Sequence, residues 1–112
     1  MSKEIESRYA PVRRFKRRKL VGRVAVVMEG RLRFETAAEI SEGGMLLRMK
    51  EPMAIGTSLE LRFFLPNDVF VSAHADVGYK LEPHEGVHFL GLRFVELSEE
   101  MRERISRFVA SA

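Results

Sequence analysis

The chain has 112 residues, of which 46% are hydrophobic, which is enough for one domain with a single core and too little to favour two. It contains no cysteine, and this excludes disulfides, thiolate metal sites and cysteine nucleophiles. The net charge of +3 combines two unlike parts: residues 1–23 hold nine Lys or Arg against two Glu, a net of +7, whereas residues 24–112 hold ten Lys or Arg against fourteen acidic residues, a net of −4.

The N-terminal segment is rich in charge and shows neither helical nor strand periodicity. Seven of the eleven residues from 13 to 23 are basic. We predict a basic arm over residues 1–19, at least partly mobile without a partner, and a folded domain over residues 20–112. A short basic arm on an acidic body favours one small anionic ligand or a docking segment over general polyanion binding.

From Leu20 onward the chain consists of short β-prone runs separated by turn residues. Glu29 and Gly30 suit a tight hairpin turn because glycine accepts a positive φ, and residues 66–68 form a turn by composition. Alternation of apolar and polar residues predicts strands at residues 24–28, 31–38, 45–49, 58–65, 69–77 and 87–95. Six short strands at regular spacing predict a small antiparallel barrel or sandwich.

The C-terminal segment follows a helical pattern. Ser98 is a good N-cap, and the two glutamates after it place negative charge in the first turn. The apolar residues that follow have i, i+4, i+7, i+8 spacing: Met101, Ile105, Phe108 and Val109. We predict an amphipathic helix over residues 98–110, with its apolar stripe buried across an open end or side of the barrel.

The basic arm contains two overlapping Arg-x-x-x-Arg pairs, Arg13 with Arg17 and Arg14 with Arg18. A guanidinium group donates two hydrogen bonds at once from a planar fork, which suits phosphate oxygens and the O6 and N7 edge of guanine. A few arginines on such a segment are therefore able to close around a guanine nucleotide. The pattern leaves open which pair binds, and a solvated or membrane-surface segment is the alternative reading of the basic run.

The second candidate element is the segment from Glu39 to Gly44, between two predicted strands. The adjacent Gly43 and Gly44 permit a backbone geometry closed to other residues and let a flat ligand approach the main chain. Ser41 offers a hydroxyl, and the Glu39 carboxylate is able to accept hydrogen bonds from N1 and N2 of a guanine. The alternative is an ordinary turn in which the Ser41 side chain caps its own backbone.

These two elements together resemble the PilZ domain, the bacterial receptor module for cyclic di-GMP. The family pattern is RxxxR followed by [D/N]xSxxG, and here 21 residues separate Arg17 from Glu39, the first residue of the acidic turn. Residues 89–100 look like the last strand of that family with its glycine, continuing into the terminal helix, so the resemblance spans residues 12–109. The matching positions are Arg13 or Arg14 with Arg17 or Arg18, then Glu39, Ser41 and Gly44.

The resemblance implies a six-stranded antiparallel β-barrel with a C-terminal helix and a binding function without catalysis. The four arginines would grip the phosphates and guanine edges of cyclic di-GMP, while Glu39, Ser41, Gly43 and Gly44 would line the guanine pocket. The arm would order on the nucleotide and signal to a separate, unidentified effector that controls motility, surface attachment or exopolysaccharide export. The sequence leaves the oligomeric state open between a monomer and a weak homodimer, and we expect no cofactor.

Two alternatives remain open at this point. Glu39 stands where the family has Asp or Asn, and its extra methylene moves the carboxylate by about 1.5 Å, so a nucleotide-independent adaptor that binds another protein is one alternative. The other is nucleic-acid binding by the arm, with Tyr9 and Phe15, beside an OB-like barrel. The acidic body argues against nucleic acid as a partner, since single-strand binders usually continue the positive groove across the sheet.

Other functional classes have less support in the residues. His84 and His88 have the spacing of a zinc pair on a helix, but Pro83 and Gly86 make this stretch a turn, so we expect no metal site. There is no nucleophile elbow and no triad spacing, so we expect no enzyme activity and no catalytic residues. No signal-peptide run and no stretch of 18 apolar residues is present, so we expect a cytoplasmic bacterial protein.

Overall fold

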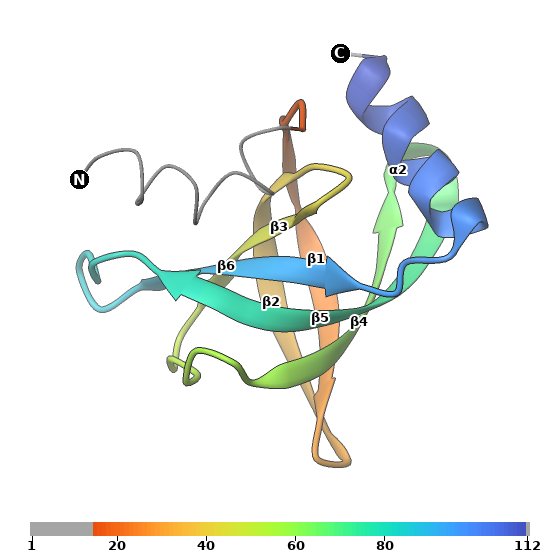
Figure 1. The fold of residues 1–112 in the computed structure, drawn as a ribbon. Coiled ribbons are helices and arrows are strands. Elements are labelled where there is room, and N and C mark those ends of the chain that lie inside the picture. Colours follow the sequence, from red (N-terminus) through yellow and green to blue (C-terminus); the bar gives the residue numbers. More distant parts are fainter. Residues whose placement is uncertain (1–14, 112) are drawn as a thin grey trace, which may run out of the picture.

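The computed structural model describes residues 15–111, which fold into an antiparallel β-barrel and one α-helix. The barrel is closed, with the strands in the order β1-β2-β3-β6-β5-β4 (Figure 1). The elements are β1 (Arg18–Met28), β2 (Arg31–Ile40), β3 (Gly44–Met49), β4 (Ser58–Leu65), the 3-10 turn η1 (Pro66–Asp68), β5 (Val69–Lys80), β6 (His88–Val95) and α2 (Glu99–Ala110). The predicted fold class, a six-stranded antiparallel barrel with a C-terminal helix, is confirmed.

Alternating apolar residues build the core of the barrel. In β4 every second residue is buried and the residues between them face outward, because successive side chains of a strand point to opposite faces. β5 repeats this pattern from Val71 to Val77. The barrel closes because β1 pairs with β2 along one edge and with β4 along the other, so none of the six described strands keeps an open edge.

The turn between β1 and β2 has the backbone that its sequence predicts. Glu29 has a φ of 51° and Gly30 a φ of 75°, so both central residues are left-handed. Two left-handed residues are typical of the type I′ turn, whose twist matches that of the strands it joins. The predicted turn at residues 66–68 is also present, as η1.

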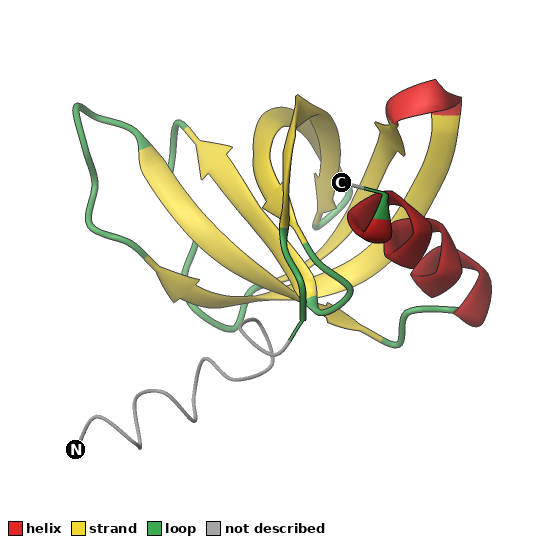
Figure 2. Cartoon of the chain, turned by 90° about the horizontal axis from the view of Figure 1, so that it is seen from above, coloured by secondary structure: helices red, strands yellow, loops and turns green. Residues whose placement is uncertain are grey.

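Helix α2 packs against the barrel where β4 and β5 meet at η1 (Figures 1 and 2). The Met101 N–H donates to Ser98 Oγ at 3.2 Å, which confirms Ser98 as the N-cap. Ile105 and Val109 are buried in the core, as the apolar stripe predicts. Within residues 15–111, no helix is long and apolar enough to cross a membrane.

Three strands extend beyond their predicted bounds by two or more residues, and a β-bulge lies in or next to each extension. β1 begins at Arg18 rather than at residue 24, β2 continues to Ile40 rather than 38, and β5 continues to Lys80 rather than 77. The register shifts lie between Lys19 and Gly22 in β1, between Ala37 and Glu39 in β2, and between Val77 and Tyr79 in β5. A bulge interrupts the two-residue alternation, so a prediction based on alternation ends there.

The start of β1 also bears on the predicted arm. Arg18 and Lys19, the last two residues of that arm, belong to β1 and pair with Ile40 and Glu39 of β2. Residues 1–14 of the predicted arm lie outside the described residues. The basic segment therefore runs directly into the barrel wall at the end of β2, beside the turn that the sequence singles out.

Candidate functional site

The strand register aligns five residues in one row across the barrel wall. Lys19 pairs with Glu39, Glu39 with Leu46, Leu46 with Gly91, and Gly91 with Tyr79. All three bulges lie at or next to this row, and bulges change the direction in which neighbouring side chains point. The row is on the outer face, because the residues on either side of Leu46 are buried in the core.

A shallow hollow borders this row. Its volume is about 10 Å³, so a ligand placed here lies mostly on the surface of the barrel and needs contacts from elsewhere to hold it. The lining residues are Arg17, Glu39, Ile40, Ser41, Gly44, Met45, Leu46 and Tyr79. The structure thus brings four of the predicted site residues together, Arg17, Glu39, Ser41 and Gly44. Arg13 and Arg14 lie outside the described residues.

Arg17 and Glu39 form an ion pair at the edge of the hollow. The Arg17 Nη1 lies 3.5 Å from the Glu39 Oε1, and the two side chains are 47% and 40% exposed. Exposed pairs of this kind contribute little, because water screens them and two long side chains must be ordered. The Arg17 guanidinium is therefore able to leave Glu39 for another anionic group at small cost in free energy.

Ser41 shapes the turn from within. Its side chain is buried, and its Oγ accepts hydrogen bonds from the N–H of Gly43 at 3.1 Å and of Gly44 at 3.2 Å. The Ser41 N–H donates in turn to the Gly44 carbonyl oxygen at 2.9 Å. This is the self-capping turn that the sequence left open as an alternative. The hydroxyl holds the loop between β2 and β3 in shape.

We expect the Ser41→Ala variant to be less stable than wild type by about 1–3 kcal/mol, because the buried N–H of Gly44 loses its partner. Urea denaturation followed by circular dichroism measures the difference. Ser58→Ala is the matched control: the Ser58 hydroxyl donates to Asp76 at 2.9 Å on the exposed surface, and its loss should change stability by less than about 0.5 kcal/mol. Equal unfolding midpoints for the two variants would contradict this role of Ser41.

The two glycines tie the turn to β6. A Cβ at Gly44 would lie 1.9 Å from the backbone oxygen of Leu92, so only glycine lets β3 approach β6 so closely. The Gly43 carbonyl oxygen accepts from the N–H of Phe94 at 3.0 Å. Gly44 is not left-handed. Close packing between strands, rather than an unusual backbone conformation, therefore explains the glycine at this position.

Tyr79 and Leu46 line the hollow although the motifs in the sequence do not point to them. Tyr79 lies farther along the row, in β5. Its ring lies over Gly91, where an added Cβ would be 2.1 Å from the ring carbon Cε1. The bulge at Gly78 turns Tyr79 toward the hollow, on the side away from Glu39. The signal in the sequence is the Gly78-Tyr79 pair that ends an alternating stretch, together with the glycine in the last strand.

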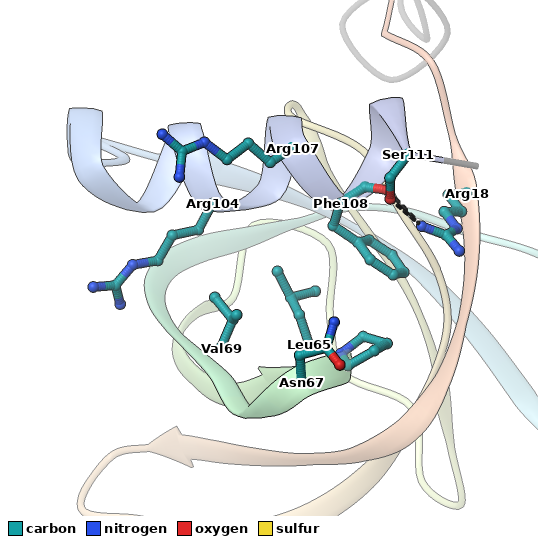
Figure 3. Close-up of a pocket in the computed structure, with 9 residues that line it drawn as sticks. Arg18, Leu65, Asn67, Val69, Arg104, Arg107, Phe108 and Ser111 are labelled. Atoms are coloured by element: carbon teal, nitrogen blue, oxygen red, sulfur yellow. Dashed lines mark hydrogen bonds between the residues drawn. The ribbon is translucent and has the colours of Figure 1, made fainter.

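Arg18 faces the opposite way from Arg17. Its Nη1 donates to the Phe108 carbonyl oxygen at 2.6 Å and to Ser111 Oγ at 2.8 Å, and its guanidinium carbon lies 4.1 Å from the centroid of the Phe108 ring (Figure 3). These residues belong to a separate cleft of about 300 Å³ beneath α2. Because neighbouring residues of an extended chain point to opposite faces, Arg17 lines the hollow and Arg18 lines the cleft.

The histidines noted in the sequence are not arranged as a metal site. His84 is bridged to Val87 in the turn before β6, and His88 begins that strand, so the two are not on a helix. In the described part of the chain, no group of three or more His, Asp or Glu is placed to hold a metal ion.

Comparisons with known proteins give one family match and several similar structures. The PilZ domain family matches residues 11–111. No curated protein matches the chain. The inhibitor of motility MotI/DgrA of Bacillus subtilis is similar in structure, with a TM-score of 0.76 and 18% identity over 87% of this chain and 49% of that one.

Two structures of Escherichia coli YcgR are also similar. YcgR in complex with c-di-GMP has a TM-score of 0.69 and 15% identity over 88% of this chain and 44% of that one. The PilZ domain of YcgR with c-di-GMP has a TM-score of 0.68 and 14% identity, and the match covers 88% of each chain. The chain spans about half the length of MotI/DgrA and of the longer YcgR chain.

These likenesses show the fold, and the family match adds the sequence pattern. The match to the family runs from Pro11 to Ser111, and so includes the basic segment, all six strands, the turn at Ser41 and helix α2. Both lines of evidence cover most of the chain. The protein therefore belongs to the PilZ domain family.

Proposed function

We propose that this protein is a receptor for cyclic di-GMP, which binds at the hollow beside the Ser41 turn and signals to a separate effector. The observation that carries the proposal is the convergence of Arg17, Glu39 and the Ser41 turn at one place on the barrel, although Arg17 and Glu39 are far apart in the sequence. Similarity to YcgR, whose structures contain c-di-GMP, supports the choice of ligand.

Arg17 is the proposed phosphate ligand among the described arginines. Arg17 faces the hollow and forms an exposed ion pair with Glu39, whereas the Arg18 side chain is hydrogen-bonded to the end of α2. The Arg-x-x-x-Arg pattern then pairs Arg17 with Arg13, and we propose this register over the pair of Arg14 with Arg18. Lys19 shares the face of Arg17 and adds positive charge beside the ligand phosphates.

The guanine base is proposed to lie across the row of residues from Glu39 to Tyr79. The Glu39 carboxylate is an acceptor for the N1 and N2 donors of guanine. Leu46 and the ring of Tyr79 supply an apolar surface for a base, and stacking on an aromatic ring contributes about 1–3 kcal/mol per base. Ser41 and both glycines act by holding the turn in shape, and no chemical step is required of any residue.

Titration calorimetry with cyclic di-GMP tests the proposal, with cyclic di-AMP as the control for recognition of guanine. We expect saturable heat with cyclic di-GMP and none with cyclic di-AMP, because adenine has no N1–H or N2 donor for Glu39. A folded wild-type protein that gives no heat with high micromolar cyclic di-GMP refutes the receptor function.

Substitutions of Glu39 separate the receptor from the alternative adaptor. Glu39→Ala is expected to weaken cyclic di-GMP binding by about 10-fold, because the acceptor for the base is lost. Glu39→Asp is expected to bind within about 3-fold of wild type, since the carboxylate is 40% exposed at a bulge and is free to adjust. Titration of both variants measures this. If the wild-type protein gives no heat with cyclic di-GMP and the Glu39→Asp variant binds it, the protein is instead a nucleotide-independent adaptor that binds a protein partner.

The proposed output is control of a separate effector in motility, attachment or exopolysaccharide export. The similar Bacillus subtilis protein is an inhibitor of motility, which makes motility the first process to test. Ordering of the basic segment on the nucleotide would change the surface shown to that effector.

A further inference from the structure

We propose that Arg18 is a positioning residue for cyclic di-GMP, so that the C-terminal turn of α2 supports the nucleotide site from the opposite face of the barrel wall. This inference rests on the proposed function. It assigns a supporting role in nucleotide binding to a residue that does not line the hollow and to a helix end that is distant from Glu39 in the sequence.

Two hydrogen bonds and one cation–π contact join Arg18 to the C-terminal turn of α2. The Phe108 carbonyl oxygen, one of the last of the helix, accepts from Arg18 Nη1 at 2.6 Å, and Ser111 Oγ accepts from the same nitrogen at 2.8 Å (Figure 3). A helix C-terminus carries partial negative charge, which favours a cation there. The Phe108 ring, 4.1 Å from the guanidinium carbon, adds a cation–π contact.

This contact restricts the directions in which Arg17 is able to point, for a reason that lies in the backbone. Arg17 precedes the first residue of β1, so the strand ladder begins only at the next residue, Arg18 opposite Ile40. Once Arg18 is held toward α2, alternation along an extended chain directs Arg17 to the other face. There its guanidinium lies 3.5 Å from Glu39, at the hollow. The contact of Arg18 with the end of α2 therefore limits the orientations open to the Arg17 side chain.

The two contacts should consequently strengthen one another. A nucleotide phosphate that orders Arg17 also restricts the backbone of Arg18, so holding Arg18 on α2 then costs less conformational entropy. Coupling between two binding events is reciprocal. Cyclic di-GMP should therefore stabilise the last turn of α2. In the same way, the contact between Arg18 and α2 should raise the affinity of the protein for cyclic di-GMP.

The affinity of the Arg18→Ala variant for cyclic di-GMP tests one direction of the coupling. We expect a loss of about 5-fold, with Arg18→Lys intermediate because it keeps the charge without the planar fork. The matched control is Arg107→Ala. Arg107 lies in the last turn of the same helix and pairs with Glu103, and its side chain has no hydrogen bond to Arg18, so its loss should leave the affinity unchanged.

Hydrogen exchange read by mass spectrometry tests the other direction. In wild type, saturating cyclic di-GMP should slow exchange both in the turn at residues 41–45 and at residues 107–111. In Arg18→Ala, saturating nucleotide should still protect the turn but no longer protect the helix end. A purely structural role of Arg18 would raise the exchange of α2 but would leave the nucleotide affinity and its effect on α2 unchanged.

Phe108→Leu provides a second variant should Arg18→Ala fail to fold, since it keeps an apolar side chain and removes the ring beneath the guanidinium. It should show the same two losses, to a smaller extent. Wild-type affinity in a folded Arg18→Ala protein, or nucleotide binding without protection of residues 107–111 in wild type, overturns this inference and leaves the receptor function standing. A folded wild type that does not bind cyclic di-GMP overturns both.

Discussion

Replacing Arg17 with alanine is expected to weaken cyclic di-GMP binding by about 10- to 100-fold, the loss of about one charge-assisted hydrogen-bonded contact to phosphate. The free energy of unfolding should stay within about 0.5 kcal/mol of wild type, because the only ion pair described for Arg17, with Glu39, is half exposed. Titration calorimetry gives the affinity, and urea denaturation gives the stability.

Arg23→Ala is the matched control for Arg17→Ala, because it removes the same charge from the same strand region. Arg23 is exposed in β1, and its guanidinium carbon lies 5.4 Å from the ring centroid of Phe34, outside the hollow. We expect its affinity for cyclic di-GMP to fall by less than about 3-fold, through long-range attraction alone. Similar losses in the two variants would indicate a diffuse electrostatic attraction instead of a specific phosphate contact at Arg17.

Gly44→Ala should have the largest effect on folding. The added Cβ would lie 1.9 Å from the Leu92 backbone oxygen and 3.0 Å from its carbonyl carbon, and backbone atoms in a sheet cannot move aside as a flexible side chain does. We expect a loss of about 3 kcal/mol of unfolding free energy, because two paired strands must separate locally. For a domain of this size, the melting temperature should fall by about 10 °C or more.

Gly22→Ala is the matched control for Gly44→Ala within the same barrel. A Cβ at Gly22 meets no heavy atom within 4 Å, and its backbone φ is not in the left-handed region. Its stability should therefore lie within about 0.5 kcal/mol of wild type in urea denaturation. If Gly44→Ala unfolds at the same urea concentration as Gly22→Ala, the close contact between β3 and β6 is not needed for the fold.

Much of the fold was predictable because its signals are local. The alternation in β4, the left-handed turn at Glu29-Gly30, and the Ser98 cap with its apolar stripe each depend on residues close together in the chain. Such signals are readable without knowledge of strand pairing. The strand ends were less predictable, because bulges in β1, β2 and β5 break the alternation from which strands are recognised.

The same bulges made parts of the site hard to predict. Tyr79 lies just beyond the bulge in β5, past the end of the predicted strand, and its ring depends on the absence of a side chain at Gly91 in the neighbouring strand. The chain separates Tyr79 from Glu39, and only the pairing of β2, β3, β6 and β5 brings them into one row. Motif spacing within a single segment contains no information on that pairing.

The basic segment and the acidic turn were identifiable from residue types and order, because guanidinium groups, a carboxylate and paired glycines carry their chemistry wherever they lie. The contact that each of these residues makes depends on the three-dimensional structure. Arg17 and Arg18 are equivalent in the sequence pattern, yet one lies beside Glu39 and the other beneath α2. Ser41 and Gly44 likewise act through buried contacts within the turn and with Leu92. These assignments follow from strand register and helix docking, which join residues that are distant in the chain.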